Sequence, residues 1–357
     1  MLKLEAILKI SVLGKFKFKS SHVFFFLALV LIVFGVIVLA KPSSDSGGSF
    51  LNKDIPTEIF KTKDFPAFEA YTKQNGAKKA YEVLKTYFKN NEPDAHDFAH
   101  VIGNVAAQDN DIDGIKICDN YYNYGCYHGF MQIYLKNHGT AAVSDMEKSC
   151  LSLGEVNAPS CLHGIGHGLM MESFYDLGGA LKNCGILKRD TQTYCFDGVF
   201  MERIIGSMLP GDKKLKIDQT SLLEPCRSVD SVYKKMCWRN QVSVWYSYFA
   251  KDTAKVASYC ASLLQDYWQI CFESIGLLNV QQIGNDSQKL VGACKIVDDV
   301  AYNDCLAGEV KELLFEGKSP DVARDLCSFA TGSFRESCLS VFEQMFRDFQ
   351  ARFGQSN

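Results

Sequence analysis

Apolar residues recur at helical spacing through most of the chain after residue 60, in paired segments separated by short polar turns. One such pair is DTAKVASYCASLL at 252–264 followed by CFESIGLLNVQQI at 271–283. Apolar side chains that repeat every three to four positions form one face of a helix, so each segment predicts an amphipathic helix. Asp252 and Pro320 suit a helix N-cap and a first helical turn. The pattern predicts an all-α fold of antiparallel helix pairs.

The most hydrophobic stretch is Val23–Ala40, which has 18 residues and no charge. A membrane-spanning helix needs about 20 apolar residues, and Ser20–His22 can extend this one. Five lysines and one glutamate precede it, which places the N-terminus in the cytoplasm by the positive-inside rule. We therefore predict a cytoplasmic basic tail over residues 1–21 and a transmembrane signal-anchor over 22–40. A cleaved signal peptide is the alternative, although its apolar region is usually shorter, about 7–15 residues.

The segment after the apolar run, KPSSDSGGSF at 41–50, is rich in Ser and Gly, so residues 41–60 are expected to form a flexible linker. Residues 61–357 then form a helical repeat domain outside the cytoplasm, either extracellular or periplasmic. The whole chain has a formal charge of −3, and the exported part is more acidic because the lysine-rich tail is not in it. Nucleic acid is therefore not an expected partner, since its binders normally carry a basic face.

All 14 cysteines lie after residue 117 and sort into seven consecutive pairs. The first pair is separated by 8 positions and the other six by 11, with a period near 34 between pairs. A period of this length is typical of helical-hairpin repeats. Because no C-x-x-C motif occurs and the domain is expected in an oxidising space, disulfides are favoured over metal or redox sites. The expected disulfides are Cys118–Cys126, Cys150–Cys161, Cys184–Cys195, Cys226–Cys237, Cys260–Cys271, Cys294–Cys305 and Cys327–Cys338.

In period and architecture, residues 60–350 resemble tetratricopeptide and Sel1-like repeats, although the Trp, Gly and Tyr consensus of tetratricopeptides is absent. The resemblance implies an αα-solenoid of about eight hairpins with a concave binding surface. The cysteine-free segment 63–91, followed by a helix start at Glu92–Asp94, is expected to form the first hairpin. The amphipathic segment Phe342–Phe353 is expected to cap the other end.

Histidine is concentrated in the first half of the chain, and none follows His167. His163 and His167 lie two and six positions after Cys161, and His128 lies two positions after Cys126. Two residues four apart on a helix lie one turn apart on the same face. Successive hairpins therefore present histidine at equivalent places.

The first hairpin extends this series if Asp94 occupies the cysteine position, because His96 and His100 then fall two and six positions after it. Stacked helices would bring both pairs and the histidine between them onto one patch. Neutral imidazole is the commonest metal ligand, and such a set suits Zn, Cu or Fe. The predicted ligands are His96, His100, His128, His163 and His167.

The position two after the cysteine stays polar in the next hairpins, where it is occupied by Asp197, Arg239 and Glu273. These residues are expected to line a groove beside the histidines. A hydrogen-bonded structural histidine network is an alternative to a metal site. A second alternative is a scaffold without enzymatic activity that binds a protein or peptide partner. Its aromatic anchors would be Trp238, Trp245, Tyr246 and Trp268.

Several catalytic motifs are absent from the sequence. The chain has no H-E-x-x-H metalloprotease motif, no G-x-S-x-G serine hydrolase motif and no P-loop. The sequence therefore predicts a binding site and leaves open whether a reaction occurs there.

Overall fold

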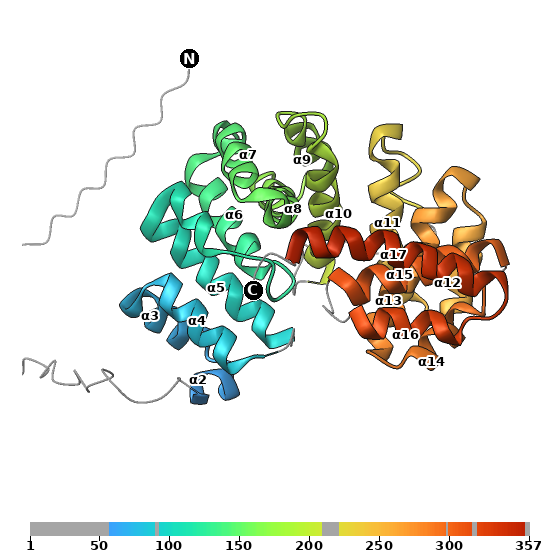
Figure 1. Cartoon of the computed structure of the whole chain (residues 1–357). Helices are drawn as coiled ribbons and strands as arrows, with labels where there is room; N and C mark the ends of the chain where they lie inside the picture. The colour runs from blue at the N-terminus through green and yellow to red at the C-terminus, as the bar shows by residue number, and fades with distance from the viewer. Residues whose placement is uncertain (1–56, 90–92, 209–220, 298, 316–319, 354–357) are drawn as a thin grey trace, which may run out of the picture. The chain divides into compact units, whose positions relative to one another are not determined.

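The computed structural model describes residues 57–89, 93–208, 221–297, 299–315 and 320–353, and every element in these ranges is a helix (Figure 1). The 3-10 helices are η1 (Asp111–Ile117), η2 (Thr140–Ala142) and η3 (Gln265–Tyr267). The α-helices are α2 (Thr57–Thr62), α3 (Phe65–Asn75), α4 (Ala77–Tyr87), α5 (Pro93–Asn110), α6 (Gly125–His138), α7 (Val143–Ser152), α8 (Gly154–Glu172), α9 (Leu177–Cys184), α10 (Gln192–Met208), α11 (Ser231–Tyr248), α12 (Thr253–Ala261), α13 (Trp268–Ile283), α14 (Ser287–Cys294), α15 (Asp299–Phe315), α16 (Pro320–Phe329) and α17 (Ser333–Phe353). The prediction of an all-α fold is confirmed.

One row of helices, here called the B helices, packs in chain order, each against the next: α5, α6, α8, α10, α11, α13, α15 and α17 (Figure 1). Most B helices also pack against the shorter helix that precedes them, as α8 does against α7 and α15 against α14. Burial is deepest in α8, where every residue of the run Ser160–Met170 is buried. A helix enclosed on every side must be apolar or have its polar groups paired. Polar side chains on the B helices therefore need an explanation.

The seven expected disulfides are all confirmed, and they leave no free cysteine. The Cα atoms of each bonded pair lie 5.3–5.8 Å apart, which is the usual range. In each disulfide the second cysteine lies in the first half of a B helix, and the first cysteine lies in the segment before it, which is a helix or helix end except at Cys226, where the chain forms a series of turns. On the chain-entropy model a closed loop of this size contributes about 3 kcal/mol to stability.

Paired glycines let neighbouring B helices touch through their backbones. A Cβ added to Gly308 on α15 would lie 2.0 Å from the carbonyl oxygen of Glu273, and one added to Gly276 on α13 would lie 2.0 Å from that of Cys305. Real Cβ atoms do not approach so closely, so only glycine fits. Close helix packing is therefore the reason for these glycines, which pair as Gly103/Gly129, Gly166/Gly198 and Gly276/Gly308.

The same glycine contacts show which residue of α5 occupies the place of the repeat cysteine. They correct the prediction that this residue is Asp94. Gly103 meets the backbone of α6 as Gly166 meets that of α10 and Gly276 that of α15. Gly166 and Gly276 each lie five residues after a cysteine, and the residue five before Gly103 is Phe98. Phe98, and not Asp94, therefore occupies the cysteine position of the first hairpin.

This correction changes which histidines are equivalent. A Cβ on Gly129 would meet the carbonyl oxygen of His100, as one on Gly198 would meet that of His163. His100 is thus the counterpart of His163, and His96 lies one turn before it. The prediction was displaced by four residues because α5 has no cysteine to anchor the alignment. A shift of four residues is about one helical turn, so the same face of α5 still carries both histidines.

The predicted basic tail (1–21) and signal-anchor (22–40) lie outside the described residues, as does the linker up to residue 56. The contacts divide the chain at Ile55 and Pro56, and α2 takes in the last four positions of the predicted linker. Of the helices that the structure describes, none combines the length and hydrophobicity that crossing a bilayer requires.

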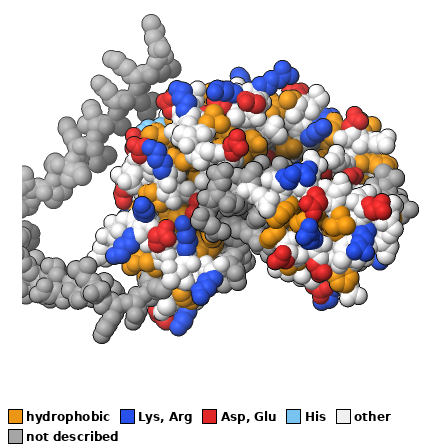
Figure 2. Space-filling view, viewed as in Figure 1, with side chains coloured by type: hydrophobic (Ala, Val, Ile, Leu, Met, Phe, Trp, Pro, Cys, Tyr) orange, Lys and Arg blue, Asp and Glu red, His pale blue; other side chains and the backbone are white. Residues whose placement is uncertain are grey.

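Two of the four aromatic anchors of the scaffold alternative are not available for a partner, whereas Tyr246 and Trp268 are partly exposed. Trp245 is completely buried and Trp238 is 5% exposed. Both side chains therefore belong to the core. On the face shown in Figure 2, Lys and Arg side chains alternate with Asp and Glu over the described surface, so this face has no patch of a single charge.

Candidate metal centre

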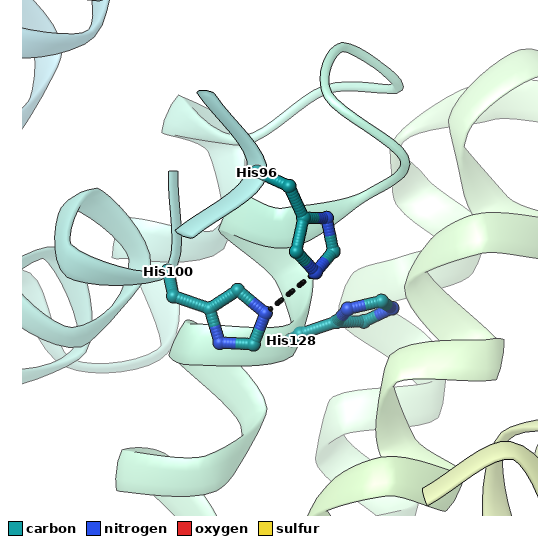
Figure 3. A group of neighbouring side chains, drawn as sticks. All are labelled: His96, His100 and His128. Atoms are coloured by element: carbon teal, nitrogen blue, oxygen red, sulfur yellow. Dashed lines mark hydrogen bonds between the residues drawn. The ribbon is translucent and has the colours of Figure 1, made fainter. Parts of the chain in front are cut away.

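The first histidine pair lies on α5. His96 and His100 are four residues apart, and their Nε2 atoms lie 3.0 Å from each other (Figure 3). The Nδ1 of His96 lies 2.8 Å from the carbonyl oxygen of Tyr122. A carbonyl only accepts, so this Nδ1 carries the proton and donates it. The Nε2 of neutral His96 therefore presents a lone pair to its neighbours.

The carbonyl that orients His96 belongs to an unusual turn before α6. The φ values of Tyr122, Asn123 and Tyr124 are 55°, 49° and 64°. This left-handed backbone conformation is rare in residues other than glycine. The Tyr122 ring is buried, and its hydroxyl donates to the carbonyl oxygen of Phe88 at 2.6 Å. This anchor holds the strained turn where its carbonyl can accept from His96.

The second histidine pair lies on α8. His163 and His167 are also four residues apart, with their Nε2 atoms 2.9 Å from each other. The Nδ1 of His163 lies 3.2 Å from a carboxylate oxygen of Asp197, and the Nδ1 of His167 lies 2.8 Å from one of Glu202. When both carboxylates are ionised, both Nδ1 atoms carry protons and both Nε2 atoms present lone pairs. A cation that binds both Nε2 atoms removes the repulsion between these lone pairs.

His128 on α6 lies between the two pairs. Its ring centroid is 5.4 Å from those of His96 and His100, 5.7 Å from that of His163 and 4.1 Å from that of His167. The side chain is 3% exposed, and neither of its ring nitrogens has a hydrogen-bond partner. A buried polar atom without a partner costs about 1–3 kcal/mol. Both ring nitrogens of His128 are therefore buried polar atoms to which the protein provides no hydrogen bond.

Burial keeps several of these imidazoles neutral. It lowers the pKa of His100 to about 3, with a smaller contribution from neighbouring His96. Burial also holds the pKa values of His128 and His167 well below the usual value, again with help from neighbouring histidines. Since a metal binds the unprotonated nitrogen, these side chains are ready to act as ligands at neutral pH.

The two carboxylates on α10 behave differently. Burial alone would raise the pKa of Asp197, but Arg239, His163 and Asn240 together hold it well below its usual value, so it stays ionised. Burial raises the pKa of Glu202 to about 7, although the hydroxyl of Tyr175, which donates to it at 2.9 Å, works in the opposite direction. Both carboxylates accept from the outer nitrogens of the α8 histidines, an arrangement that orients metal-binding histidines in many proteins.

The described residues contain two histidine triads whose donor atoms are close enough to hold a metal ion. One is His96, His100 and His128, and the other is His128, His163 and His167, with all donor atoms of a triad within 4.8 Å of one another. Metal–nitrogen bonds of about 2.1 Å place two ligand nitrogens roughly 3.0–3.4 Å apart, close to the observed 2.9 and 3.0 Å. A third group, Cys294, Cys305 and Glu309, is unsuitable because its two cysteines form a disulfide.

No family model, curated protein or solved structure matches this chain. Its chemistry is therefore inferred from the site.

The structure brings all five predicted histidines together. Of the predicted groove residues, Asp197 contacts His163 directly, and Arg239 lies 3.7 Å from Asp197. Glu273 instead pairs with Lys311 at 2.6 Å. The remaining described histidine, His138, lies apart from the cluster beside Asp111.

Sequence reasoning gave Asp197 only as a groove residue, did not place Glu202 on the face of the histidines, and missed Asn240. Glu202 lies seven positions after Cys195, a place where neighbouring hairpins have no matching carboxylate, so the repeat pattern did not single it out. Asn240, which donates to Asp197 at 2.8 Å, stands three positions after its cysteine, where four of the other hairpins have glycine. That departure from glycine was a usable signal.

Proposed function

We propose that this protein binds a transition metal ion, Zn, Cu or Fe, at the cluster of His96, His100, His128, His163 and His167. The observation that carries the proposal is His128: its two ring nitrogens are buried and unpartnered, and two further histidine pairs surround it. A histidine with a purely structural role would have its nitrogens paired with protein groups.

The surroundings of the cluster support the same function. Three of the five histidines have their Nδ1 atom beside a carbonyl or carboxylate oxygen, which directs Nε2 toward the cluster. These partners determine the tautomer and increase the basicity of the ligand. Imidazole donors with carboxylates behind them suit Zn, Cu and Fe better than Ca or Mg, which prefer oxygen ligands.

The proposal includes the setting of the site. Seven disulfides are favoured in an oxidising compartment, and the apolar run Val23–Ala40 is suited to a membrane anchor. We therefore infer a single-pass protein whose αα-solenoid of about eight hairpins presents the metal site outside the cytoplasm.

Calorimetric titration of the purified, chelator-treated full-length chain with Zn²⁺ and Cu²⁺ tests the proposal. We expect saturable binding that is weakened at least tenfold in His163→Ala/His167→Ala. The matched control is His138→Ala, which removes a histidine of α6 outside the cluster and should bind as the wild type does. Equal binding by all three proteins, or none by the wild type, would refute the proposed site.

A further inference from the structure

The two triads of the cluster share one residue, His128. We propose that His128 bridges two metal ions, one completed by His96 and His100 and the other by His163 and His167. This inference rests on the proposed function and deepens it, because it makes the site a dinuclear centre with a bridging imidazolate.

The first support is that both ring nitrogens of His128 need a partner. An imidazole that binds one metal keeps its other nitrogen for a hydrogen bond, as His96, His163 and His167 do here with oxygen atoms. His128 has no such partner on either nitrogen. In Figure 3, one nitrogen of His128 lies on the side of His96 and His100, and the other lies at the end of the ring that points away from these two histidines.

The second support is the spacing of the rings. With metal–nitrogen bonds of about 2.1 Å, imidazole centroids on one ion lie roughly 4.5–5.2 Å apart. The α5 triad has centroid separations of 4.7, 5.4 and 5.4 Å. The α8 triad has separations of 4.8, 5.7 and 4.1 Å, the last between the stacked rings of His128 and His167. A shift of the His128 ring away from His167 and toward His163 would even out these last two distances.

The third support is charge. Two divalent ions in a buried site need negative charge nearby, and both buried carboxylates lie on the α8 side, where Asp197 and Glu202 contact His163 and His167. On the α5 side, the orienting group among the described residues is the neutral carbonyl of Tyr122. We therefore expect the α8 triad to bind its ion more tightly, with the α5 triad filling second.

Binding of the second ion changes the protonation of His128. The neutral ring carries one N–H proton, and a metal bound to each nitrogen requires that this proton leave to solvent. The resulting imidazolate provides one negative charge that both ions share. No electron is transferred in this step, and the metals keep their oxidation state.

The test is copper loading of the full-length chain, followed by elemental analysis and electron paramagnetic resonance. Two Cu²⁺ ions joined by an imidazolate couple antiferromagnetically, so we expect two copper ions per chain and a low-temperature spin count well below the copper content. His96→Ala/His100→Ala and His163→Ala/His167→Ala should each retain one copper ion with a full spin count, and the first variant should bind it more tightly. His138→Ala is the control and should keep the coupled signal.

The wild-type protein alone can overturn the inference, so the test does not depend on the folding of the variants. Two copper ions with a full spin count would contradict the bridge. One copper ion per chain would contradict the second centre while leaving the proposed function intact. An absence of bound copper together with an absence of bound zinc would contradict the proposed function itself.

Discussion

At the scale of single residues, His128 distinguishes a metal ligand from a structural histidine. In the metal-free chain its two unpartnered nitrogens cost free energy, so His128→Leu is expected to leave the free energy of unfolding unchanged or raise it by about 1 kcal/mol. The same variant should lose the stabilisation that added Zn²⁺ gives the wild type. Denaturant unfolding with and without Zn²⁺ measures both effects. A large loss of stability in the metal-free variant would indicate a structural role.

A second residue, Glu309 on α15, should make stability depend on pH. Its side chain is completely buried, with Oε1 accepting from Asn279 and Oε2 lacking a partner. Burial raises its pKa from 4.5 to about 8. Between these values the folded chain holds a proton that the unfolded chain has lost, so stability falls as pH rises from about 4.5 to about 8.

Substitution of Glu309 by Gln should remove this dependence. We expect Glu309→Gln to match the wild type near pH 4.5 and to exceed it at pH 8.5 by on the order of 4 kcal/mol. Denaturant unfolding at both pH values, with the disulfides intact, measures the difference. Glu82→Gln, at an exposed position on α4, is the control and should follow the wild type. A constant difference between Glu309→Gln and the wild type at both pH values would contradict the assignment.

Single-residue chemistry was only partly accessible from the sequence. The five histidines could be predicted because His100, His128 and His163 share a repeated position, and His96 and His167 lie one helical turn from it on the same faces. Of the orienting groups, Asp197 could be predicted as a groove residue because it follows the same repeat. The Tyr122 carbonyl could not, because it depends on a turn conformation, and the contact of Glu202 could not, because it depends on how α10 faces α8.

At the scale of elements, glycine pairs determine how closely the B helices approach. A Cβ at Gly308 would overlap the backbone of α13, so Gly308→Ala must push the two helices apart and should cost about 1–3 kcal/mol or more. Gly292 on α14 has no atom within 4 Å of its added Cβ. Gly292→Ala should therefore stabilise the protein by roughly 0.5–1 kcal/mol. Thermal unfolding measures the change in stability of each variant. Equal changes in the two variants would contradict the close packing of α13 and α15.

The elements themselves could be predicted well where cysteines marked the register. The constant separation of 11 gave six of the disulfides directly, and the pair at 8 followed from its place in the series. In α5, Phe98 takes the place of the cysteine and is as buried as one. Without that marker, a shift of one helical turn fits the hydrophobic pattern equally well, which explains the error at Asp94.

At the scale of the whole molecule, the B helices combine packing and site. Their row brings side chains from α5, α6, α8 and α10, which lie far apart in the sequence, into one cluster that is half-buried at α5 and buried at α6 and α8. The disulfides connect each B helix after α5 to the segment before it, so the cluster has a rigid support. Such pre-organisation lowers the cost of ordering ligands around an ion.

The measurement that tests the central claim most directly is elemental analysis of the oxidised full-length chain, purified without a metal-binding tag. We predict at least one Zn, Cu or Fe ion per chain in the wild type and in His138→Ala, and at least one ion per chain fewer in His163→Ala/His167→Ala, with helix content unchanged by circular dichroism. Wild-type protein that holds no metal even after incubation with each ion would contradict the claim.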